Sequence, residues 1–144
     1  MQWKTKQMKQ SGFTLIEVMV VIVILGVLAA LIVPNVVGKV DSSKIKTTKI
    51  ALGTVAGELK NYKLDNNHYP TMQEGGLEAL TNAPPNAKNF PTGGYLEKYP
   101  NDSWDNPLQY IIPGSDGRDF DLYSFGADGK QGGEGNDADI YYQP

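Results

Sequence analysis

Two hydrophobic patterns follow each other along the first 62 residues of the chain. From Phe13 to Val33 every residue except Glu17 is apolar, threonine or glycine. At about 1.5 Å of rise per residue, this run would form a helix of about 31 Å, close to the thickness of the apolar core of a bilayer. The first pattern therefore predicts a membrane-spanning helix at residues 13–33, with one carboxylate inside it.

The second pattern is that of an amphipathic helix. After residue 35 the apolar residues are mostly three or four apart, with lysines and a glutamate between them; they are Val36, Val40, Ile45, Leu52, Val55, Leu59 and Tyr62. We expect one long helix over residues 13–62, apolar in its first half and amphipathic in its second. Pro34 should bend it or loosen it locally.

The rest of the chain, residues 63–144, is rich in turn-forming residues and predicts a small globular region. A short helix is expected near residues 76–81. Two β-rich segments, residues 108–112 and 119–125, are joined by Pro-Gly-Ser-Asp-Gly, which predicts a hairpin. "DIYY" near the C-terminus would add an edge strand. The fold class is therefore α+β, a long N-terminal helix packed on a small antiparallel sheet.

The basic N-terminus sets the expected topology. Lys4, Lys6 and Lys9 precede the apolar run, as in a secretory signal peptide. The run is longer than the apolar region of such a peptide and passes through Ala29 and Ala30 into further apolar residues, which favours a membrane anchor. The lysines predict a cytoplasmic N-terminus, with the globular region on the other side of the membrane.

Charge and residue types exclude several function classes. The net charge is −3, and residues 1–12 hold three of the 13 basic residues and none of the 16 acidic ones. Without them no basic patch remains for nucleic acid. The chain has no cysteine, one histidine, His68, and no G-x-S-x-G or phosphate-binding glycine loop. The sequence is therefore not typical of an enzyme.

The segment Gly12-Phe13-Thr14-Leu15-Ile16-Glu17, after a short basic leader, resembles the processing site of type IV pilins and pseudopilins. In that family a membrane-embedded prepilin peptidase cuts after the glycine and methylates the new N-terminal residue. The resemblance implies that residues 1–12 are removed and that Phe13 becomes the methylated N-terminus. The alternative is a plain anchor with a chance glutamate.

The resemblance also supplies a partner for Glu17. Cleavage after Gly12 would create an ammonium group at Phe13, and an unpaired charge in the membrane costs a few kcal/mol. When subunits stack, Glu17 of one subunit can meet the ammonium of its neighbour. We expect Glu17 to favour assembly and to fix its register.

Further motifs narrow the resemblance to the major pseudopilins of type II secretion systems. They are "NYKLDNNHYPT", "EGGLEAL", "FPTGGYLEKYPND", "SWDNPLQY" and "LYSFGADGKQGGEGNDADI". The chain departs from the family at residues 102–105, which read Asp-Ser-Trp-Asp in place of Asp-Pro-Trp-Gly, and in its tail "YYQP". The resemblance implies a homopolymeric periplasmic filament that works with minor pseudopilins, an inner-membrane assembly platform and an outer-membrane secretin.

Glycines and acidic residues crowd the segment after residue 125. Carboxylates on a flexible backbone suit Ca²⁺, although a solvated Asp/Gly turn is the commoner outcome of such a sequence. The spacing is not that of an EF-hand. By resemblance, the segment binds one Ca²⁺ through the carboxylates of Asp128, Asp137 and Asp139 and the main-chain carbonyls of Phe125 and Lys130.

Two other functions fit part of these observations. One is a type IV major pilin for adhesion or motility, although the C-terminal disulfide loop usual there is missing. The other is a single-pass anchored protein that uses Ca²⁺ to hold a ligand. The identity of the N-terminal residue separates both pilin-like functions from the anchored protein.

Overall fold

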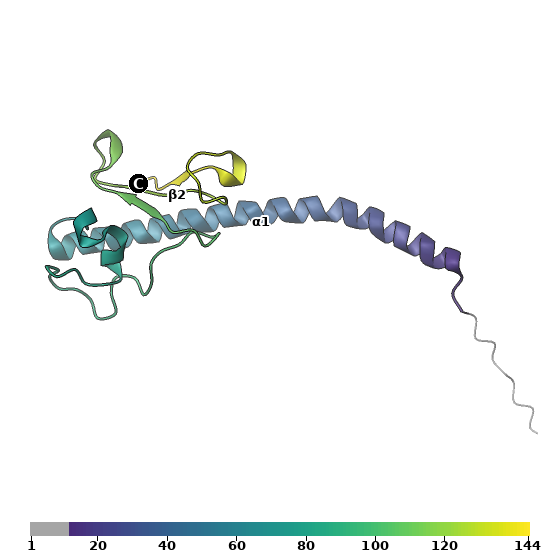
Figure 1. Cartoon of the computed structure of the whole chain (residues 1–144), viewed down its shortest axis with the longest axis horizontal. Coiled ribbons are helices and arrows are strands. Elements are labelled where there is room, and N and C mark those ends of the chain that lie inside the picture. Colours follow the sequence, from purple (N-terminus) through teal and green to yellow (C-terminus); the bar gives the residue numbers. More distant parts are fainter. Residues whose placement is uncertain (1–11) are drawn as a thin grey trace, which may run out of the picture. The chain divides into compact units, whose positions relative to one another are not determined.

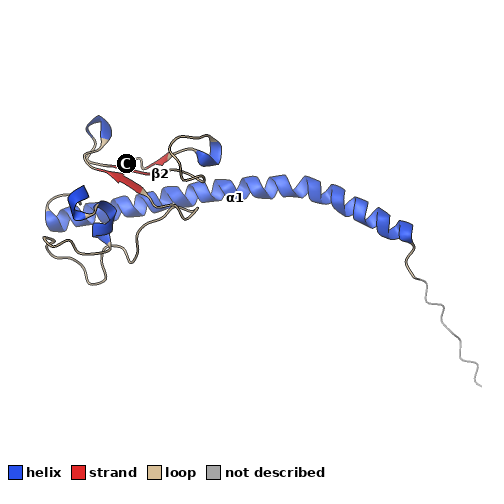
Figure 2. Ribbon diagram, viewed as in Figure 1, coloured by secondary structure: helices blue, strands red, loops and turns tan. Residues whose placement is uncertain are grey.

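The computed structural model describes residues 12–144, and the side chains of all of these except 33–37. Its elements are one helix, α1 (Leu15–Asn66), three strands, β1 (Gln109–Ile111), β2 (Asp121–Ser124) and β3 (Ile140–Tyr141), and four short 3₁₀ turns. The described chain falls into two compact units that meet within α1, between residues 39 and 40. The α+β class predicted from the sequence is confirmed, with the elements coloured in Figure 2.

The first unit is the apolar half of α1. An 18-residue stretch, Leu15–Ile32, is long and apolar enough to cross a membrane, and none of it is buried inside the protein. The side chains of this stretch are largely exposed, Leu15 to 81% and Leu25 to 60%. The helix α1 continues through Pro34 without interruption. These exposed side chains require lipid or another protein chain as a partner.

The second unit packs the amphipathic half of α1 against the sheet (Figure 1). Buried residues of α1 pack against residues of the 3₁₀ helix η2 (Gly76–Leu80) and of the sheet region. The core residues on α1 are Leu52, Val55, Ala56, Leu59 and Tyr62, and those after α1 are Leu77, Ala79, Leu80, Leu108, Tyr110, Phe120, Leu122 and Ile140. Every buried apolar side chain of this core lies at or after Leu52. The unit from Val40 to Pro144 thus holds a complete core of its own and can fold without the apolar half of α1.

The sheet is antiparallel in the order β1-β2-β3. Tyr110 pairs with Leu122 and Ser124 with Ile140, so that the same face of each strand meets α1. Both β-rich segments, the hairpin between them and the "DIYY" edge strand are confirmed, although β1 and β2 are shorter than the sequence suggested.

The end of α1 differs from the expectation by four residues. The pattern placed it at Tyr62, the last apolar position, whereas the helix continues to Asn66. The Asn66 side chain donates to the Tyr62 carbonyl (3.1 Å), and Asn67 ends the helix with a positive φ of 66°. The last turn is thus held by polar contacts, and these cannot be predicted from the spacing of apolar residues.

Candidate functional site

The start of α1 is a capping box built from Thr14 and Glu17. The Glu17 carboxylate accepts hydrogen bonds from the Thr14 N–H (2.7 Å) and the Thr14 hydroxyl (2.9 Å), and the Glu17 N–H points to the Thr14 hydroxyl (3.4 Å). These contacts satisfy N–H groups that a helix start leaves unpaired. Both bonds to the carboxylate end on the same oxygen, Oε2. Within residues 12–144 no hydrogen bond reaches Oε1, so that oxygen is free to take a further partner.

The two residues of the predicted cleavage site lie just before this cap. Gly12 is exposed, and a Cβ added there would meet nothing within 4 Å. Phe13 is the most exposed apolar side chain of those described. Both residues are thus exposed, and cleavage of the bond between them stays a prediction. Residues 1–11 of the predicted leader lie outside the described residues.

The acidic loop, residues 125–139, joins β2 to β3 and folds back on itself. A Cβ on Gly126 would lie 2.7 Å from the Ala138 carbonyl oxygen, and one on Gly133 would lie 2.5 Å from that of Asp137. Both glycines have a positive φ, 74° and 90°. Only glycine allows the backbone to approach its own carbonyl oxygens so closely.

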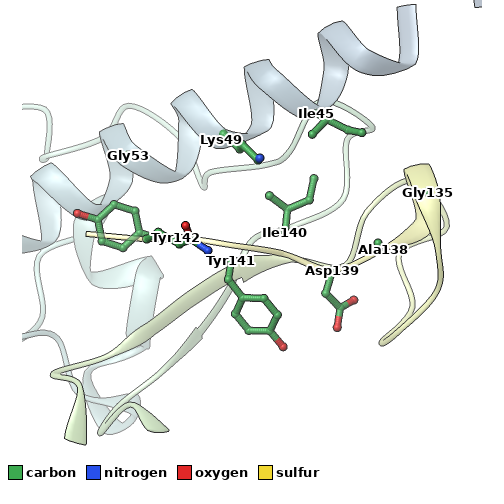
Figure 3. Close-up of a pocket in the computed structure, with 10 residues that line it drawn as sticks. Ile45, Lys49, Gly53, Gly135, Ala138, Asp139, Ile140, Tyr141 and Tyr142 are labelled. Carbon is green, nitrogen blue, oxygen red and sulfur yellow. The ribbon is translucent and has the colours of Figure 1, made fainter. Parts of the chain in front are cut away.

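The three predicted carboxylate ligands have different surroundings. Asp128 Oδ1 accepts the Lys130 N–H and Asp139 Oδ1 accepts the Gly132 N–H, each at 3.0 Å. Asp137 is exposed. In Figure 3 the Asp139 side chain points away from α1, whereas Ile140 points toward it, as alternation along a strand requires. Asp139 is thus held at the end of β3 by the burial of its neighbour.

These residues fit Ca²⁺ in donor type but not as one cluster of three carboxylates. Among the residues described, no three His, Cys, Asp or Glu side chains come close enough together to hold a metal. Asp128, Asp137 and Asp139 therefore do not form one cluster here, and Oδ1 of Asp128 and of Asp139 each accept a backbone N–H of the loop. Two carboxylates and the carbonyls of one tight loop remain, which are the hard oxygen donors that Ca²⁺ takes.

His68 is a structural residue at the end of α1. Its Nδ1 lies 2.9 Å from the Asn66 carbonyl oxygen, and its Nε2 lies 3.0 Å from Oε1 of Glu74. Both neighbours only accept hydrogen bonds, so the doubly protonated ring satisfies both. Glu74 also closes a capping box with Thr71. The ring thereby ties the end of α1 to the 3₁₀ helix η1 (Met72–Glu74).

This contact predicts a pH dependence. The hydrogen bonds to the Asn66 carbonyl and to Glu74 raise the pKa of His68 above its ordinary value. The stabilisation is therefore complete below about pH 6.5 and is lost as the pH rises through the raised pKa. It should be worth less than about 1 kcal/mol, because the ring is half exposed to solvent. An NMR titration of His68, the single histidine of the chain, measures its pKa directly.

The matched variant for that titration is Glu74→Gln. Glutamine can still close the capping box with Thr71, but it carries no charge. We expect the variant to lower the pKa of His68, with the bond to the Asn66 carbonyl retained. An unchanged titration curve would show that the Glu74 carboxylate does not hold the ring.

Comparisons with known proteins match both parts of the chain in order. Residues 7–33 match the model of the prokaryotic N-terminal methylation motif. Residues 35–143 match the model described as type II secretion system (T2SS), protein G. The chain belongs to the type II secretion system protein G family. The resemblance inferred from the sequence is thereby confirmed.

Individual relatives of the protein G family agree along nearly the whole chain. A type II secretion system core protein G of Pseudomonas aeruginosa is 56% identical over 135 residues, 92% of this chain and 94% of the relative. That of Vibrio cholerae is 49% identical over 140 residues, 94% and 92% of the two chains. The crystal structure of the major pseudopilin of enterohaemorrhagic Escherichia coli is 34% identical, with a TM-score of 0.60, and the match covers 75% of this chain and 93% of that one.

Membership of the protein G family settles the coarse function. The family is one of secretion-system components. The methylation motif and the apolar helix make this chain a membrane-anchored pseudopilin. The N-terminal segment and the C-terminal motifs had predicted this family from the sequence, and that prediction is confirmed.

Sequence reasoning missed two features of the site. The Thr14-x-x-Glu17 pattern is a capping-box signature, but Glu17 was considered only as an intermolecular partner. The other feature is a buried hydrogen-bond network where the acidic loop begins, in which the Ser124 hydroxyl donates to the Asp102 carboxylate (2.6 Å). Asp102 and Ser124 are 22 residues apart, and no local pattern pairs them.

Proposed function

We infer that this chain is the major structural subunit of a type II secretion pseudopilus. It polymerises through its N-terminal helix into a periplasmic filament that drives export of folded proteins across the outer membrane. The observation that carries this proposal is the match of one chain, in order, to the methylation motif and to protein G. The names of the relatives favour secretion over an adhesive or motile type IV pilus.

Processing at Gly12-Phe13 prepares the chain for assembly. The prepilin peptidase removes residues 1–12 and methylates Phe13, which leaves an ammonium group at the start of α1. The exposure of both residues supports this step. The N-terminus then lies at the cytoplasmic side of the inner membrane, and the unit from Val40 onward lies in the periplasm.

Glu17 recognises the ammonium of a neighbouring subunit. Thr14 holds Oε2 of the carboxylate, so Oε1 is left to face the incoming charge. An ion pair in an apolar setting offsets part of the cost of both charges. The exposed apolar side chains of Leu15–Ile32 provide the rest of the contact, by packing against the same segment of other subunits.

The acidic loop would bind Ca²⁺ through Asp128, Asp137 and Asp139 and the main-chain carbonyls of Phe125 and Lys130. The ion would neutralise the carboxylates and crosslink the loop, a role that disulfides have in other small domains. Minor pseudopilins, the inner-membrane assembly platform and the outer-membrane secretin are the further partners of the filament.

Mass spectrometry of the purified membrane protein tests this proposal. We expect a mature chain that begins with methylated Phe13 and lacks residues 1–12. A plain anchored binding protein would keep its leader. An intact N-terminus, or an unmodified Phe13, would contradict both the pseudopilin and the pilin functions.

A further inference from the structure

The acidic loop begins at a peptide group that the buried interior of the domain holds in place. Ser124, the last residue of β2, is fully buried. Its hydroxyl oxygen accepts the Gly126 N–H at 3.0 Å. That N–H belongs to the same planar peptide group as the carbonyl of Phe125. The hydrogen bond to Ser124 therefore fixes the direction of the Phe125 carbonyl oxygen.

Ser124 is itself fixed by a carboxylate. Its hydroxyl donates to Oδ2 of Asp102 at 2.6 Å, and Asp102 is 7% exposed. Oδ1 of Asp102 accepts the backbone N–H groups of Trp104 and Asn106, each at 2.9 Å. The serine hydroxyl has a single proton, which it gives to Asp102. A lone pair of the same oxygen therefore accepts the Gly126 N–H, so that the roles of donor and acceptor are fixed along the chain of bonds from Gly126 through Ser124 to Asp102.

The next peptide group of the loop is held at both ends as well. The Asn106 side chain donates to the Gly126 carbonyl oxygen (2.9 Å), and the Ala127 N–H donates to the Asn136 carbonyl (2.8 Å). The two peptide groups around Gly126 are thus fixed before any ion is present. Asp128, the first predicted carboxylate ligand, follows this fixed segment directly.

We propose that Ser124, held by Asp102, is a positioning residue that fixes the direction of the Phe125 carbonyl, one of the ligands proposed for Ca²⁺ in the acidic loop. Asn106 fixes the adjoining peptide group in support. This inference rests on the proposed calcium role, and it adds residues that do not touch the ion. Groups hydrogen-bonded to metal ligands typically change metal affinity by about 10–100-fold when they are removed.

The test is calorimetric titration of the Val40–Pro144 domain with Ca²⁺, in wild type, Ser124→Ala and Asn106→Ala. We expect the Kd for Ca²⁺ to rise about tenfold or more in Ser124→Ala and to a smaller extent in Asn106→Ala. In the absence of Ca²⁺, Ser124→Ala should also speed hydrogen exchange of the Gly126 amide. Asn106 is only partly buried, and its variant keeps the test valid if Ser124→Ala fails to fold.

Thr48→Val is the matched control. Thr48 is as buried as Ser124 and bonds Ser103, at 3.0 Å to the hydroxyl and 3.1 Å to the N–H, and its side-chain hydrogen bonds in the described residues do not involve the acidic loop. It should lower the melting temperature without changing the Kd. Equal Kd values in wild type and both loop-side variants would overturn the positioning role alone. A wild-type domain that takes up no Ca²⁺ would overturn the calcium role itself.

Discussion

Glu17→Ala chains are expected to enter the membrane normally but to fail to form filaments. Removal of a carboxylate from an apolar helix makes insertion easier, since a central Asp costs about 2.5–3.5 kcal/mol on insertion scales. Assembly is lost because the ammonium of the neighbouring Phe13 then has no partner in the apolar contact. Membrane fractionation measures insertion, and electron microscopy of sheared filaments measures assembly.

Glu17→Gln separates the two contacts of this residue. Glutamine at this position can still cap the helix with Thr14, but it cannot pair with an ammonium group. We expect Glu17→Gln to assemble as poorly as Glu17→Ala. Normal filaments from Glu17→Gln would mean that the carboxylate is needed only for the capping box, and the intermolecular pair would be wrong.

Removal of Ca²⁺ should have the second large effect. An ion present at 100 times its Kd stabilises a folded domain by about 2.7 kcal/mol. For a domain of this size that corresponds to roughly 10 °C in Tm. A chelator should therefore lower the Tm of the Val40–Pro144 domain by about this amount, and Asp128→Ala should melt at the lower temperature with or without the chelator.

The control for this experiment is Asp119→Ala. Asp119 is an exposed acidic residue outside the acidic loop, and its surface ion pair with Lys63 (3.4 Å) is worth little. This variant should keep the full response to the chelator. If wild type and Asp128→Ala melt at equal temperatures with and without the chelator, the loop is only a solvated Asp/Gly turn.

The sequence was most informative where a single pattern decided the structure. The long apolar run from Phe13 to Val33, with Glu17 inside it, was sufficient to predict the first half of α1. The spacing of Leu52, Val55 and Leu59 predicted the second half, because burial there follows the helical period. The hairpin was equally clear from its turn residues. The site residues Gly12 and Phe13 were recognised by resemblance; the structure shows that both are exposed, and their processing stays a prediction.

The remaining features depend on contacts between distant segments. The fixing of Gly126 requires Asp102, Asn106 and Ser124 to meet, and these residues come from different turns and strands. The surroundings of each acidic side chain likewise depend on how the loop packs on itself. A list of acidic residues therefore predicted the chemistry of the loop but not which carboxylates lie together.

The export of folded proteins by a strain that lacks this chain is the most direct test of its role. We predict that folded exoproteins accumulate in the periplasm of the deletion strain. Wild-type protein supplied in trans should return them to the medium, and Glu17→Ala should not. Unchanged release of exoproteins by the deletion strain, with no periplasmic accumulation, would contradict a role as the major subunit of the secretion filament.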